Sequence, residues 1–168
     1  RFFGVWEALE TDTTAGSLIW KVEHRHAYGS NVSPQALADE IGYAGLVHLT
    51  LSDQRTRLSN LYWRQSWKDS GLVLVGGWTD SSDYVDVYTL ASPWTDFFNY
   101  AFSTGSAAMP VPNEGLALGI GGYLSDHVYA VAGFADANSD PHRPSDAFES
   151  FFEQREYFKH VEIGFIRS

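Results

Sequence analysis

The sequence predicts an all-β fold of antiparallel strands joined as hairpins, and three observations predict it. Apolar and polar residues alternate with a period of two in five separate segments. Aromatic residues make up 15% of the chain, yet the mean hydropathy is only −0.22. No apolar run approaches the ~18 residues that a membrane-spanning helix needs, which excludes a helical membrane protein.

The clearest alternation lies in Ser17–Tyr28, where one face is mostly apolar and the other is charged. Its charged face carries Lys21, Glu23 and Arg25. The other four alternating segments are Gly45–Ser52, Leu58–Lys68, Leu116–Leu124 and the last strand, around Val161–Phe165. In each of them a single face gathers the large apolar side chains, as in a strand that separates two environments.

Three further segments are apolar on both faces or rich in small residues: Phe2–Leu9, Leu72–Trp78 and Val128–Ala135. Turn residues bound them, and β-branched or aromatic residues fill them, so they also indicate strands. The total is about eight strands connected by polar turns.

Two stretches interrupt the succession of hairpins. Ser33–Glu40 predicts a short helix with Ser33 as N-cap and Pro34 at its first position. Residues 85–112 form a long connection rich in aromatic residues, and connections of this length are often functional or folded inward. We expect residues 1–168 to form one domain or part of one.

Composition excludes several classes of function. Lys+Arg number 11 against 21 Asp+Glu, a net charge of −10, which argues against a protein that grips nucleic acid. The absence of cysteine excludes a disulfide framework, a zinc ribbon and a cysteine nucleophile. The chain begins at Arg1 without an apolar targeting segment, so we expect a mature or trimmed protein.

Strands with one aromatic, apolar face and one polar face occur in two settings. In a soluble sandwich the apolar face is the core, whereas in an outer-membrane barrel it meets lipid and the polar face lines water. Periodicity alone leaves both settings open.

Six short motifs occur along the chain, and their order carries as much information as the motifs themselves. They are Arg57–Trp67, Val75–Asp86, Phe97–Phe102, Gly115–Gly119 with Tyr123 and Asp126, Tyr129–Asn138, and Phe158–Gly164. Each motif is short and degenerate, but together they resemble the carbohydrate-selective porins of Gram-negative outer membranes over most of the chain, from about Gly16 to Arg167.

The resemblance implies an up-and-down transmembrane β-barrel in the bacterial outer membrane through which small sugars diffuse passively. Porins of this family have about sixteen strands, roughly the number that an aqueous pore needs, which is twice the number predicted here. We therefore expect a portion of such a barrel, a complete small barrel being the alternative. The barrel would be surrounded by lipid or lipopolysaccharide, and the protein would be a monomer or a homotrimer.

The residues expected to line the pore come from the polar faces of two strands. They are Lys21, Glu23, Arg25, Asn60, Tyr62 and Arg64. The aromatic stretch around Trp94 and Phe98 is a candidate constriction loop. A register error of one residue would reverse every assignment made from alternation.

Metal and cofactor chemistry has little support. Asp80, Asp83 and Asp86 cluster at a strand end and are weak candidates for a calcium site, with an acidic loop as the simpler interpretation. Asp136, Asn138 and Asp140 imitate the start of a calcium loop, but the residues that follow indicate a turn. No motif predicts a cofactor or a catalytic site.

The pair Trp63 and Trp67 has two interpretations. On a lipid-facing surface the pair belongs to an aromatic girdle, and on a soluble protein it would be a platform for stacking sugars. The latter defines the alternative function, a secreted carbohydrate-binding β-sandwich module.

Overall fold

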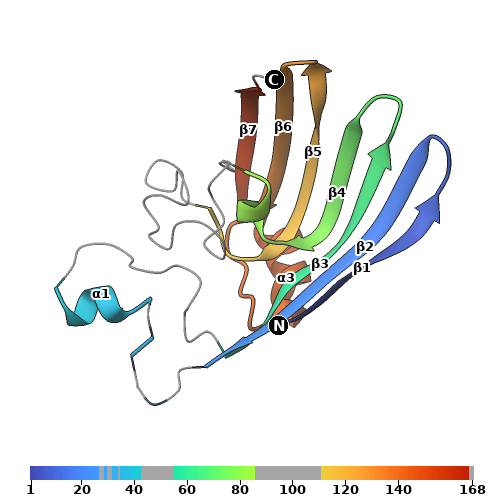
Figure 1. The fold of residues 1–168 in the computed structure, drawn as a ribbon. Helices are drawn as coiled ribbons and strands as arrows, with labels where there is room; N and C mark the ends of the chain where they lie inside the picture. The colour runs from blue at the N-terminus through green and yellow to red at the C-terminus, as the bar shows by residue number, and fades with distance from the viewer. Residues whose placement is uncertain (27–28, 30–31, 34, 43–54, 86–110, 167–168) are drawn as a thin grey trace. The chain divides into compact units, whose positions relative to one another are not determined.

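The computed structural model describes residues 1–26, 29, 32–33, 35–42, 55–85 and 111–166. Seven strands form one antiparallel sheet in which sequence neighbours are also spatial neighbours, from β1 to β7 (Figure 1). The strands are β1 (Phe2–Glu10), β2 (Thr14–Arg25), β3 (Arg55–Trp67), β4 (Leu72–Thr79), β5 (Gly115–Ser125), β6 (Val128–Asp136) and β7 (Tyr157–Phe165). The all-β, up-and-down fold predicted from alternation is confirmed.

Seven of the roughly eight predicted strands match these elements to within a few residues. The eighth, Gly45–Ser52, lies outside the described residues, as does most of the long connection 85–112. The chain divides into two compact units, one made of Arg1–Val22, Leu58–Val85 and Pro112–Ser168, the other of Glu23–Arg57 and Asp86–Val111.

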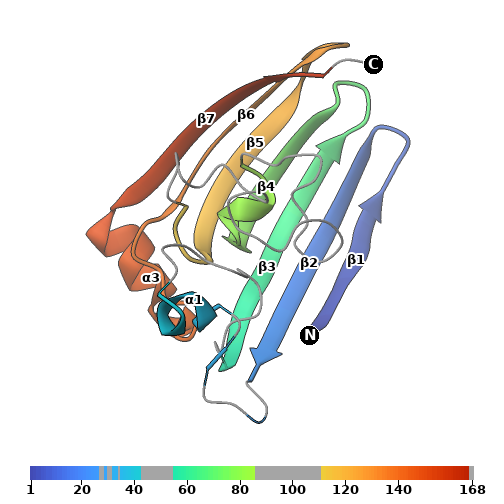
Figure 2. The same cartoon turned by 60° about the vertical axis from the view of Figure 1, so that its left-hand side comes forward.

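Short and long connections alternate along the chain. The turns between β1 and β2, β3 and β4, and β5 and β6 contain residues 11–13, 68–71 and 126–127. The intervening connections are much longer and carry the helical pieces: α1 (Leu37–Glu40), η1 (Ser81–Asp83), η2 (Pro144–Asp146), α3 (Ala147–Glu149) and η3 (Ser150–Gln154). Figure 2 shows α3 beside the β7 end of the sheet. Outer-membrane barrels show the same asymmetry between short turns and long loops.

The predicted helix is shorter than expected. It was predicted over Ser33–Glu40, but α1 begins at Leu37, and Pro34 lies outside the described residues. The Ser33 hydroxyl still accepts a hydrogen bond from the Ala36 backbone N–H at 3.3 Å. Within the described residues, no helix is long and apolar enough to cross a membrane.

Cross-strand pairing defines the two faces of the sheet, because residues paired in an antiparallel ladder point to the same side. We call one side the apolar face. One of its rows runs from Leu74 through Ile120 and Ala132 to Val161. We call the other side the mixed face. One of its rows runs Arg64, Val75, Gly119, Gly133, His160.

The large side chains of the apolar face are exposed rather than packed. Val161 is 77% exposed and Ile163 70%, and Leu118 and Ile120 also lie open. Among the described residues a single sheet is present, so no second sheet covers this face. Trp63 and Trp67 share this face with Leu61. A water-soluble sandwich would bury these side chains in its core.

Candidate functional site

On the mixed face, polar side chains of β2 and β3 converge on the turn that follows β4. This turn, Asp80–Tyr84, contains η1, and we call it the η1 bracket. The Lys21 ammonium lies 3.5 Å from the Asp83 carboxylate. The Asn60 side chain donates to Asp83 Oδ2 at 3.2 Å and accepts from the Asp80 backbone N–H at 3.2 Å. Lys21 and Asn60, two of the residues expected to line the pore, thus contact the same carboxylate.

Tyr62, a third residue expected to line the pore, contacts Tyr84 at the end of the η1 bracket. The Tyr84 hydroxyl donates a hydrogen bond to the Tyr62 hydroxyl. The two rings meet edge to face, with centroids 5.9 Å apart. Tyr62 itself is buried. Tyr84 is thereby fixed over the sheet rather than free to rotate.

The acidic residues of the bracket have structural partners of their own. Asp80 caps η1 by accepting from the Ser82 backbone N–H at 3.0 Å and from the Ser82 hydroxyl at 2.6 Å. Burial raises the pKa of Asp83, and the neighbouring Asp80 charge raises it further, while Lys21 and Asn60 oppose the shift. Burial also raises the pKa of Tyr84, which keeps its hydroxyl protonated as a donor.

The weak metal prediction gains no support from this geometry. Asp86 lies outside the described residues. Among the residues the structure describes, no three His, Cys, Asp or Glu side chains gather as a metal site would need.

Glu23 and Arg25 form a second polar cluster, in the other compact unit. Glu23 is 3% exposed and accepts from Arg25 Nη2 at 2.8 Å and from Arg57 Nη2 at 3.4 Å. Two guanidinium groups thus share one carboxylate. Guanidinium groups suit the recognition of oxygen-rich ligands because their donors are fixed in a plane.

Sequence reasoning missed Arg57. Strict alternation from Leu61 would place Arg57 on the apolar face, yet it contacts Glu23. A second contact, His24 Nδ1 to Thr56 Oγ1 at 2.8 Å, shows the same change of parity at the start of β3. The strand therefore changes parity between Arg57 and Leu61, an irregularity that alternation cannot show.

The remaining predicted residues are exposed or undescribed. Arg64 is exposed on the mixed face, paired with Val75. Trp94 and Phe98, the candidate constriction residues, lie outside the described residues.

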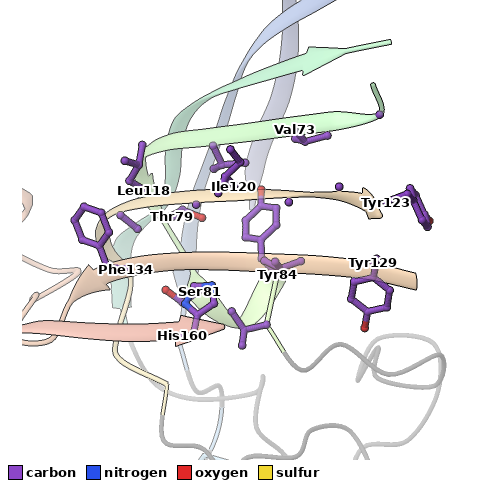
Figure 3. A pocket seen from close by; sticks show the side chains of 18 residues that line it. Val73, Thr79, Ser81, Tyr84, Leu118, Ile120, Tyr123, Tyr129, Phe134 and His160 are labelled. Atoms are coloured by element: carbon purple, nitrogen blue, oxygen red, sulfur yellow. The ribbon is translucent and has the colours of Figure 1, made fainter. Parts of the chain in front are cut away.

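Between β4 and β7 the mixed face is quite different, because small residues replace the charged ones. We call Gly77, Ala117, Gly119, Gly121, Gly133 and Ala135 the glycine strip. A hollow of about 290 Å³ lies over part of the strip, namely Ala117, Gly119 and Gly121, and is lined also by Val73, Tyr84, Tyr129 and His160 (Figure 3). The sequence pattern alone predicts only that these glycines lie in strands.

Two aromatic side chains cover glycines on neighbouring strands beside this hollow. A Cβ on Gly164 would overlap the Tyr129 ring, and one on Gly133 would contact His160 at 2.8 Å. The Tyr129 hydroxyl donates to Glu162 Oε1 at 2.5 Å, which fixes the ring. Cross-strand pairs of an aromatic residue and a glycine stabilise a sheet where the glycine itself contributes no packing.

The segment that imitates a calcium loop forms turns, as predicted. Asp136 is fully buried and accepts from the Asn138 backbone N–H and the Ser150 hydroxyl, both at 2.9 Å. Asp140 accepts from the His142 backbone N–H at 2.9 Å, and this bond, with the Arg143 side chain, lowers the pKa of Asp140.

Comparison with known proteins gives one match. The family model described as "Carbohydrate-selective porin, OprB family" matches residues 11–164, nearly the whole chain. Neither the curated proteins nor the solved structures include a significant match. The chain belongs to the carbohydrate-selective porin family of the Gram-negative outer membrane, as its motifs indicated.

Proposed function

We propose that in this carbohydrate-selective porin the mixed face of the sheet lines the water-filled lumen and the apolar face meets lipid. Family membership establishes a porin through which carbohydrates pass, and a channel family rather than an enzyme family. Which residues of this chain meet the sugar, and that the chain catalyses no reaction, are part of the proposal.

The observation that carries it is the separation of side chains between the two faces. Val161, Ile163 and Phe165 on β7 are each at least 70% exposed, which water would penalise and hydrocarbon would not. The opposite face carries Lys21 and Asp83 in an ion pair. Such a separation suits a wall between lipid and water.

Passage of sugar would then depend on exchange of hydrogen bonds. A sugar that sheds part of its hydration needs replacement donors and acceptors along the wall, held weakly enough to allow exit. The Lys21–Asp83 pair and the Glu23–Arg25–Arg57 cluster offer such groups. We extend the proposal to Arg64 on the same face, and to the stretch around Trp94 and Phe98 as a constriction loop within residues 85–112.

In this proposal the apolar face contacts lipid or lipopolysaccharide, and Trp63 and Trp67 lie near the headgroups. We propose that residues 1–168 contribute to one barrel domain, alone or in a trimer. The alternative, a carbohydrate-binding sandwich, would require a second sheet over the apolar face, and the described residues contain none.

A liposome-swelling assay on the whole protein tests the lumen assignment. We expect Arg25→Ala and Arg64→Ala to change glucose flux several-fold, because each removes a donor from the wall. Arg143→Ala is the matched control, since Arg143 is an exposed arginine paired with Asp140 in the β6–β7 connection. Equal fluxes in all three variants and the wild type would remove Arg25 and Arg64 from the pore wall.

A further inference from the structure

We propose that the hollow over the glycine strip is a stacking site for the pyranose ring of a sugar in transit. The inference rests on the proposed function, because it requires the mixed face to line the lumen. It adds a site for the sugar that the family match does not assign.

The floor of the hollow is made flat by the absence of side chains. Ala117, Gly119 and Gly121 alternate along β5 on the mixed face, and all three line the hollow. A ligand can therefore approach the β5 backbone closely. The volume of about 290 Å³ is at the lower end of the range for small-molecule sites, as a single sugar ring requires.

Apolar and aromatic groups stand around this floor. Val73, Val75 and Val131 extend it, and the rings of Tyr84 and Tyr129 stand beside it. Both rings are fixed, Tyr84 by Tyr62 and Tyr129 by Glu162. The C–H faces of a pyranose pack well on such surfaces, and preorganised rings cost little entropy on binding.

Polar groups stand at the ends of the same row. Arg64 and His160 flank Val75, Gly119 and Gly133 in the pairing order across four neighbouring strand pairs. Adjacent strands are about 4.8 Å apart, so Arg64 lies within about 10 Å of Gly119, a reach that a guanidinium spans. His160 lines the hollow, and its Nδ1 is buried without a hydrogen-bond partner in the structure.

This arrangement favours a sugar over a purely apolar ligand. A ring with one C–H face and hydroxyls at its edge would place the face on the glycine floor and the hydroxyls toward Arg64 and His160. An open-chain hexitol has the same hydroxyls but no rigid apolar face, so it should bind poorly.

Current block in planar lipid bilayers tests this on the whole protein, with glucose and mannitol as probes. We expect glucose to interrupt the wild-type ion current more strongly than mannitol does. Gly119→Leu fills the hollow and should weaken the glucose block at least about tenfold, as the loss of a shaped pocket usually does. Gly119→Ala, whose Cβ meets only Ala132 O at 3.8 Å, should fold normally and give an intermediate effect.

Ala132→Leu is the matched control, because it adds a leucine side chain to the apolar face of the adjacent strand. It should leave the difference between glucose and mannitol unchanged. An unchanged glucose block in the Gly119 variants would overturn the stacking site and leave the porin function intact. A lower thermal stability of these variants with unchanged block would show that another part of the chain fills the hollow, and would also overturn it.

The proposed function fails in a different way. If the wild-type protein carried no glucose in liposomes while retaining an ion current, the lumen assignment itself would be wrong, whatever the Gly119 variants did.

Discussion

The mixed face consists of two regions that differ in the size and polarity of their side chains. Around the η1 bracket, side chains are long, polar and tied to one another, as with Asn60, Lys21 and Asp83. Over the glycine strip, side chains are short or absent, and two aromatic residues are fixed at the margin. The comparison teaches that one wall can offer hydrogen bonds in one place and a bare apolar surface in another. A sugar, with polar edges and apolar faces, needs both.

A large expected effect comes from disrupting the η1 bracket. Asn60 is buried, and Asn60→Leu would leave the half-buried Asp80 N–H and the exposed Asp83 carboxylate without their shared partner, a loss of about 1–2 kcal/mol. We expect a marked fall in the temperature at which the protein unfolds on semi-native gels. Asn113→Leu, at an exposed position, is the control. Equal midpoints for both variants would show that the bracket does not stabilise the fold.

The glycine strip should be sensitive to added bulk at some positions and tolerant at others. A Cβ at Gly133 would lie 2.7 Å from Leu118 O and 3.0 Å from Gly119 Cα, so Gly133→Val should destabilise the protein by about 2 kcal/mol. Gly119→Ala on the paired strand should be nearly neutral. If both substitutions lowered the unfolding midpoint equally, the strip would be uniformly strained rather than locally tight.

The smallest effect concerns pH. The pKa of Asp83 is raised by burial, so between its unfolded and folded pKa values the folded protein binds more protons than the unfolded chain. This contribution to stability is therefore present in acid and lost as the pH rises through the folded pKa. Asp83→Asn removes the titration and can still accept from Asn60. We expect its unfolding midpoint, relative to wild type, to rise from acid to neutral pH.

The contrary result for Asp83→Asn is also informative. A variant less stable than wild type at neutral pH, with no change in the pH dependence, would mean that the ion pair with Lys21 outweighs the cost of burying the carboxylate.

The strands were predictable because one-sided burial in lipid or water forces alternation, as in β7, where Val161 and Ile163 alternate with His160 and Glu162. The convergence of Asn60 on Asp83 was not predictable, because it depends on how η1 folds back over residues 23 positions earlier. The parity change between Arg57 and Leu61 was not predictable either, because an argument from alternation assumes a regular strand.

Two further features gave only weak signals. The helical stretch formed by η2, α3 and η3 was assigned no element, although Pro144 suits a first helical position and Phe148 and Phe152 stack at a helical spacing. The hollow could not be predicted, because a glycine in a strand sequence does not reveal which neighbours leave space above it.

The strictly sequential order of the sheet has a consequence for how the protein is assembled. Each of the seven described strands pairs with its neighbours in sequence, three of these pairs through short turns and three through long connections. Hairpins can be added one after another, each using the last as its template, and the entropy of closing a loop grows only slowly with the length of the connection. A delay in biogenesis would thus leave an incomplete sheet with its strands in the correct order. The unpaired edge of its last strand is the part that a chaperone would have to protect.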